Sequence, residues 1–81
     1  MMPLSMARPG ERATILEIIG GRGLRGRLAN LGLLPGVEID VISNRPGPLI
    51  IKRGAARLGL GHGVAHRILV SLVPNPQMGG N

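Results

Sequence analysis

The chain is small and basic, and it has neither aromatic nor sulfhydryl side chains. It has 81 residues, a formal net charge of +6, and no Phe, Tyr, Trp or Cys. The missing cysteines exclude disulfides and thiolate metal sites. The missing aromatics exclude the ring-lined grooves that bind proline-rich peptides and the platforms that stack single-stranded bases. This length and composition predict one domain with an aliphatic core.

The sequence shows no signal for insertion into a membrane or for secretion. No apolar run approaches the about 20 residues that span a bilayer, and the first ten residues lack the charged start and the long apolar stretch of a signal peptide. We therefore expect a cytoplasmic protein without direct membrane insertion.

Most of the chain is typical of short strands bounded by Pro and Gly. Segments with strand character are expected at residues 11–19, 37–43, 49–52, 57–60 and 67–73. The first ten residues are expected to form an arm that tucks Leu4 and Met6 into the core, and residues 61–66 to hold about one helical turn. This pattern predicts a mainly β fold at residues 1–73, a small, strongly bent barrel of about five short strands with one inserted α-helix. A disordered tail is expected at residues 74–81.

The inserted helix is expected at about residues 23–31. Leu24, Leu28 and Leu31 recur at i, i+4 and i+7, so they are expected to pack on one face against the core. Gly32 follows at the position where a helix favours a left-handed cap.

The segment before the helix contains a glycine pattern that also occurs in dinucleotide-binding proteins. Residues 21–26 read GRGLRG and match G-x-G-x-x-G after an expected strand. That site needs several parallel strands with covering helices, which the rest of the chain does not supply. We interpret these glycines as a loose turn that allows the helix to pack closely on the strands.

Three arginines, Arg22, Arg25 and Arg27, crowd the beginning of the expected helix. The helix dipole is positive at that end, so each exposed cation there costs about 0.3–1 kcal/mol. Two interpretations stay open, namely solvated side chains at a small cost and a docking patch for an acidic partner. We take these arginines, together with Leu34, as the candidate partner-binding residues.

Two histidines, His62 and His66, have the i, i+4 spacing that can present two imidazoles to one metal ion on a helix. No Asp, Glu or Cys lies nearby in the sequence, and two ligands make a weak site. We expect that no cofactor is required, and that ferrous iron or another transition metal would be held there only weakly.

The acids do not form a catalytic pattern. Glu38 and Asp40 share one face of an expected strand, where paired carboxylates can act as acid and base. Without a neighbouring nucleophile or a partner cleft, we interpret them as a solvated strand face. We therefore predict a non-enzymatic protein.

Three motifs in a fixed order resemble the FeoA family of small proteins of bacterial ferrous iron uptake. They are Pro-Gly-x-x-Ala-x-Ile at residues 9–15, Arg-Leu-x-x-Leu-Gly-Leu-x-Pro-Gly at residues 27–36, and Ala-x-x-Ile-x-Val at residues 65–70. The resemblance covers about residues 4–73. It implies an SH3-like β-barrel with an inserted helix, no enzymatic activity of its own, and an accessory role beside FeoB, the membrane ferrous iron transporter with a cytosolic GTPase domain.

The function predicted from this resemblance is that of an accessory protein that docks on a FeoB-type transporter and modulates transport. Such a protein would lie in the cytoplasm, peripheral to the inner membrane through its partner. The alternatives are a transition-metal carrier and a basic nucleic-acid-binding barrel. Nucleic acid is disfavoured because, without aromatics, only salt-sensitive phosphate contacts remain. Bare strand edges leave self-association open.

Overall fold

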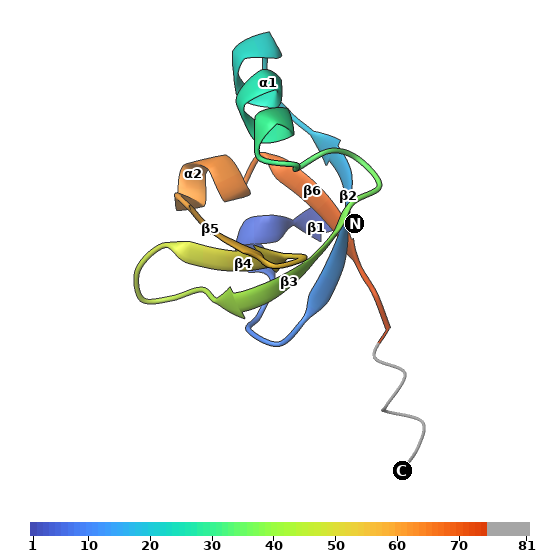
Figure 1. Ribbon diagram of the computed structural model, residues 1–81. Coiled ribbons are helices and arrows are strands. Elements are labelled where there is room, and N and C mark those ends of the chain that lie inside the picture. The colour runs from blue at the N-terminus through green and yellow to red at the C-terminus, as the bar shows by residue number, and fades with distance from the viewer. Residues whose placement is uncertain (75–81) are drawn as a thin grey trace.

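The fold is built on one antiparallel sheet that curls around an aliphatic core (Figure 1). The structure is a computed structural model that describes residues 1–74. Within them, six strands pair in the order β1-β6-β2-β3-β4-β5. The strands are β1 (Met2–Pro3), β2 (Arg12–Ile18), β3 (Glu38–Ser43), β4 (Leu49–Arg53), β5 (Ala56–Leu60) and β6 (Ile68–Leu72). A 3-10 helix, η1 (Leu4–Met6), and two α-helices, α1 (Arg22–Asn30) and α2 (His62–Ala65), complete the fold.

The predicted mainly β fold with one inserted helix is confirmed. Each expected strand is present within one residue of its expected ends, and the expected turn after β5 is α2. The structure adds one strand in the segment expected to be an arm, because Met2 pairs with Val70 and Pro3 with Leu69. Of the predicted tail, residues 75–81 lie outside the described residues.

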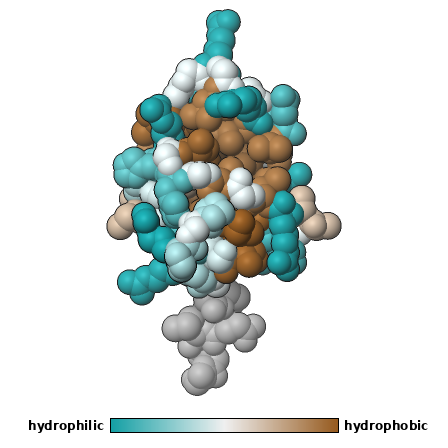
Figure 2. Space-filling model, turned by 90° about the vertical axis from the view of Figure 1, so that its left-hand side faces the viewer, coloured by the Kyte–Doolittle hydropathy of each residue, from teal (hydrophilic) through white to brown (hydrophobic). Residues whose placement is uncertain are grey.

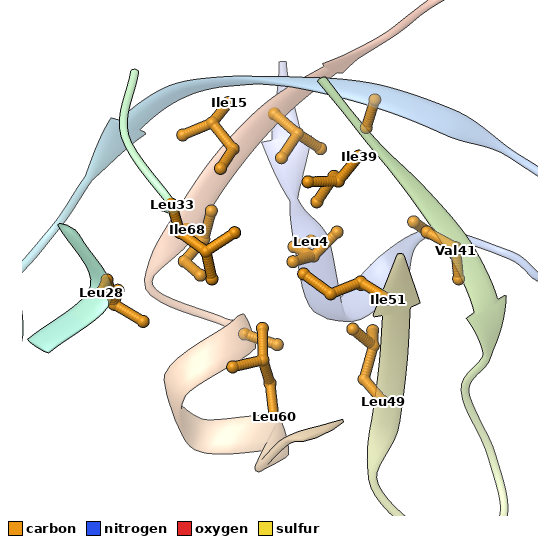
Figure 3. Close-up of a cluster of buried hydrophobic side chains, with 14 of the residues drawn as sticks. Leu4, Ile15, Leu28, Leu33, Ile39, Val41, Leu49, Ile51, Leu60 and Ile68 are labelled. Carbon is orange, nitrogen blue, oxygen red and sulfur yellow. The ribbon is translucent and has the colours of Figure 1, made fainter. Parts of the chain in front are cut away.

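The core is filled by aliphatic side chains that converge from the strands, from η1 and from the segment after α1 (Figure 3). Leu4 is completely buried, as predicted, whereas the prediction for Met6 is wrong because its side chain is 64% exposed. The two residues belong to a 3-10 turn, where successive side chains are about 120° apart. One of them therefore faces the core and the other faces solvent.

A β-bulge interrupts β2. The register of β2 against β6 shifts between Ile15 and Glu17. Alternation before the shift buries Ala13 and Ile15, and after it Ile18 is buried while Leu16 stays 42% exposed. The bulge therefore keeps Glu17 at the surface and brings Ile18 into the core, while Leu16 faces outward by the ordinary alternation that follows Ile15.

The leucine pattern of α1 is only partly confirmed. Leu28 is buried and Leu24 packs against the core from a half-buried position, but Leu31 is 43% exposed. The prediction that Leu31 joins the core is wrong, because the helix ends at Asn30 and Leu31 caps it. Leu33 takes the core position and is completely buried.

The cap explains this exchange. Gly32 has a φ of +82°, which confirms the predicted left-handed cap. Its N–H donates to Ala29 O at 2.9 Å, and the next N–H, of Leu33, donates to Leu28 O at 2.8 Å. These two bonds form a Schellman motif, in which the residue after the glycine returns onto the last helical turn. Leu33 is thereby placed beside the buried Leu28 (Figure 3).

Candidate functional site

Helix α1 stands at one end of the molecule and offers most of its surface to solvent (Figure 1). Leu28 is its one buried residue within the described chain, and Arg22, Arg25 and Arg27 are all exposed. No side chain of residues 1–74 caps its first turn, and no acid occurs there. The positive end of the helix dipole therefore coincides with uncompensated guanidinium groups.

The structure divides the predicted partner-binding residues between two faces of α1. Arg25 and Leu34 line a groove of about 240 Å³ together with the outward-turned Leu16. Arg27 lines a different, larger cleft between α1 and α2, while Arg22 lines neither. This division follows from helical geometry. Arg25 and Arg27 are two residues apart, so their side chains leave the helix in directions that differ by about 200°.

The groove beside Arg25 is apolar with mixed charge at its rim. Leu16 and Leu34 are 42% and 46% exposed, and Glu17 lies in the same lining. Arg25 Nε donates to Ile18 O at 3.4 Å, which directs the guanidinium along the end of β2. The groove thus places two exposed leucines beside the guanidinium of Arg25, whose direction is set by its hydrogen bond.

The larger cleft lies between α1 and α2 and has a volume of about 1010 Å³. Its apolar lining comes from Ile19, Leu24, Val64 and Leu69. Its polar lining comes from Arg27, Arg45, Arg67, His62 and His66. On the side of the molecule that carries α2, Figure 2 shows an apolar area between hydrophilic side chains.

The two predicted metal-ligand candidates, His62 and His66, line this cleft together, and each ring also contacts a neighbouring segment. His62 Nε2 donates to Gly47 O at 2.7 Å, which attaches α2 to the loop between β3 and β4. His66 Nδ1 lies 3.2 Å from Ser5 Oγ, which connects the end of α2 to η1. Binding of a metal by His62 Nε2 would break the contact with the loop.

The donor set does not fit a resident metal. Within residues 1–74, no group of three or more His, Cys, Asp or Glu side chains gathers to hold an ion. The two imidazoles instead share their cleft with three guanidinium groups, which repel a cation. Metal binding by His62 and His66 stays a prediction.

Asn44 is a buried positioning residue that the sequence pattern did not indicate. Its Nδ2 donates to Ser5 O at 3.1 Å and to Ala7 O at 2.8 Å. Asn44 and His62 therefore hold the 44–48 loop at two points and fix the backbone next to Arg45. The sequence does show an Asn at the start of a Pro-Gly turn, which is typical of a side chain that bonds to nearby backbone. The hydrogen-bond partners of Asn44, however, lie 37 and 39 residues away along the sequence.

The acids on β3 are partly paired. Arg12 Nε lies 2.8 Å from Asp40 Oδ1 across the β2–β3 ladder, the one ion pair found within residues 1–74. The hydrogen bond that Arg12 Nε donates to Asp40 Oδ1, and the negative charge of Asp40, raise the pKa of Arg12. Glu38 is exposed. Asp40 thus serves a cross-strand pair at the surface.

Together the curled sheet, the inserted helix and the surface clefts define a small SH3-like barrel. A solved structure of FeoA from Stenotrophomonas maltophilia with zinc, described as a prokaryotic SH3 domain protein, has this fold. It aligns with a TM-score of 0.75 at 25% identity, covering 88% of this chain and 91% of that one.

Sequence comparison shows the family. The FeoA domain matches residues 2–72, and this chain belongs to the FeoA family. A protein of Methanocaldococcus jannaschii, provisionally named Fe(2+) transport protein A, is 36% identical over 70 residues, which are 86% of this chain and 85% of that protein. A crystal structure of an iron uptake regulatory protein (FeoA) aligns with a TM-score of 0.82 at 38% identity, covering 89% of this chain and 96% of that one. The family places the chain in ferrous iron transport.

None of the helices in residues 1–74 combines the length and the apolar character needed to cross a membrane.

Proposed function

We propose that this protein is a non-enzymatic accessory of ferrous iron uptake that docks on a FeoB-type transporter and modulates transport. Membership of the FeoA family supports the link to ferrous iron transport. The relative from Stenotrophomonas maltophilia is itself proposed to act as a ferrous iron transport activating factor. The docking partner is the cytosolic GTPase domain of the transporter, and this chain associates with the membrane only through it.

The observation that carries the proposal is the exposed, basic surface of α1. A helix with one buried residue contributes little to the core, yet it carries three exposed arginines, Arg22 and Arg25 toward its positive end and Arg27 in its last turn. Leu34, at 46% exposure, lies beside Arg25 in the groove next to this helix. Arginine is enriched in protein interfaces, and the exposed apolar surface beside Arg25 can be buried by a partner.

A titration followed by nuclear magnetic resonance tests this docking. The isotope-labelled chain is mixed with the GTPase domain of its cognate ferrous transporter, with and without bound nucleotide. We expect shifts of the amide signals of Arg22–Asn30 and Leu34, because these residues form the contact. The double variant Arg22→Glu with Arg25→Glu should weaken binding about tenfold or more, a change of about 1.4 kcal/mol in binding free energy.

A control variant separates the specific contact from general attraction by a basic protein. Arg8→Glu with Arg57→Glu changes the net charge equally at two exposed positions outside α1. Equal loss of binding in both variants, or shifts confined to strands far from α1, would contradict docking through this helix.

A further inference from the structure

The cleft between α1 and α2 is lined by basic side chains and by no acidic one. All four acids lie within residues 1–74, and none of them lines the cleft between α1 and α2. Glu11 and Asp40 line a cavity with Arg12 at another site, and Glu17 belongs to the groove beside Arg25. The cleft itself carries Arg27, Arg45 and Arg67, so its positive charge has no internal counterpart.

The three cleft arginines come from three separate segments. Arg27 belongs to α1, Arg45 to the loop after β3, and Arg67 to the turn between α2 and β6. All three are exposed, and none takes part in the one ion pair found in the described chain. A ligand in the cleft can therefore meet guanidinium groups from several directions at once, which suits pairing with carboxylates.

Between these arginines the cleft is apolar. Ile19 is 49% exposed, and Leu24 and Val64 are half-buried side chains packed against the core. Binding of an aliphatic side chain would remove this surface from water, at about 25 cal/mol for each Å² of apolar area. A simple anion has no apolar group that could cover this surface. The chain has no Phe, Tyr or Trp ring that could stack on a nucleic-acid base.

The backbone that frames the cleft is held by side-chain hydrogen bonds. Asn44 attaches the 44–48 loop to η1, and His62 attaches the same loop to α2. The contact between Ser5 and His66 joins η1 to the end of α2. The mouth of the cleft is therefore organised before any ligand arrives, which lowers the entropy lost on binding.

We propose that the cleft between α1 and α2 binds an extended acidic segment of a partner protein. Its carboxylates pair with Arg27, Arg45 and Arg67, and an aliphatic side chain of the same segment occupies the apolar lining between them. A volume of about 1010 Å³ accommodates several residues of an extended chain. This site goes beyond the proposed function. It shares Leu24 and Arg27 with the exposed surface of α1, but it is separate from the groove of Arg25 and Leu34 and does not require the transporter to be the partner.

Two synthetic peptides test the site. One alternates Asp and Leu over six residues, so that an extended chain presents carboxylates on one side and leucines on the other. The other has the same pattern with Asn in place of Asp. Titration of the labelled chain with the acidic peptide should shift the amide signals of Gly20, Gly21, Leu24 and Val64, and the Asn peptide should bind at least tenfold more weakly.

Charge reversal identifies the residues responsible. The triple variant of Arg27→Glu, Arg45→Glu and Arg67→Glu should weaken binding of the acidic peptide at least tenfold. The matched variant of Arg8→Glu, Lys52→Glu and Arg57→Glu, all exposed and outside the cleft, should bind as the wild type does. A circular dichroism spectrum and an unfolding curve establish that each variant is folded.

Three results would overturn the inference. Equal binding of the Asn and Asp peptides would show that the carboxylates are not recognised. An equal loss of peptide binding in the two triple variants would show that net charge alone attracts the peptide. Shifts of the same amides by oligothymidylate or inorganic phosphate, at lower concentrations than by the peptide, would assign the cleft to a phosphate ligand. Failure of the transporter titration alone would leave the cleft proposal standing, because the peptide experiment contains no transporter.

Discussion

Asn44 shows how one side chain determines the shape of a site formed by distant segments. It is 91% buried, and its amide supplies donors to two carbonyl groups of the N-terminal segment, Ser5 O and Ala7 O. The next residue is Arg45, whose side chain belongs to the cleft. The position of that cation therefore depends on a hydrogen-bonded anchor rather than on its own contacts.

Replacement of Asn44 by alanine should lower the free energy of unfolding by about 1–3 kcal/mol, because Ser5 O and Ala7 O lose a donor in a buried place. Urea unfolding followed by circular dichroism measures the change. Ser43→Ala, at the exposed neighbouring position, is the control and should change the stability little. A loss in Asn44→Ala no larger than in this control would show that the amide is not an anchor.

Leu31 and Leu33 differ in burial from what the sequence pattern predicted. The helical repeat favoured Leu31 for the core, while the cap places Leu33 there and leaves Leu31 43% exposed. The sequence predicted the left-handed Gly32 correctly. It did not show that the chain returns onto the helix immediately after the glycine, since helical periodicity does not apply beyond a cap.

Leu33→Ala should therefore destabilise the protein by about 2–5 kcal/mol, the usual range for a leucine removed from a packed core. Leu31→Ala removes a largely exposed side chain and should change the stability by about 0.5 kcal/mol or less. Unfolding curves of both variants under one condition make the comparison. The opposite order would mean that the helix continues through Leu31.

At the scale of elements, α1 is a helix with low intrinsic stability. Its nine residues include Gly23 and Gly26, and its first turn has arginine where acids are favourable. It is nevertheless defined, because Leu28 and Leu33 attach its end to the core. A weakly stabilised helix with an exposed basic surface suits an element that exists to contact a partner.

Gly26→Ala should stabilise the protein by about 0.5–1 kcal/mol, because alanine loses less backbone entropy in a helix interior. A Cβ at Gly26 meets no atom within 4 Å. Gly32→Ala is the contrasting variant, since its φ is +82° and its Cβ would meet the Arg53 guanidinium, so it should destabilise the protein. Melting temperatures of the two variants provide the measurement, and equal shifts of one sign would contradict this description of α1.

The sequence predicted the elements better than it predicted the site. Strand and helix ends follow from β-branched runs, leucine spacing and the Pro and Gly positions, all of which act over a few residues. The larger cleft joins η1, α1, the 44–48 loop and α2, whose proximity depends on the pairing of β1 with β6 and on Asn44. Arg45 and Arg67 were therefore not recognisable as neighbours of Arg27.

Five of the ten basic side chains of the whole molecule lie on α1 or in the cleft between α1 and α2, and none of the four acids lines that cleft. Arg12 is paired with Asp40 at the β2–β3 ladder, and the hydrogen bond to Asp40 raises the pKa of Arg12. The arginines of α1 and of the cleft are not part of this ion pair and are exposed, so they can meet a partner. Such a field steers association with an acidic surface and weakens as salt is added.

Uptake of radioactive ferrous iron by cells tests the accessory function most directly. The cells retain the cognate FeoB-type transporter and lack the gene for this protein, which is then supplied as wild type, as Arg22→Glu with Arg25→Glu, or as Arg8→Glu with Arg57→Glu. We predict that deletion changes the uptake rate, and that the wild type and the control variant restore it while the α1 variant does not. An uptake rate unaffected by deletion, or full restoration by the α1 variant, would contradict the proposal that this protein modulates transport through α1.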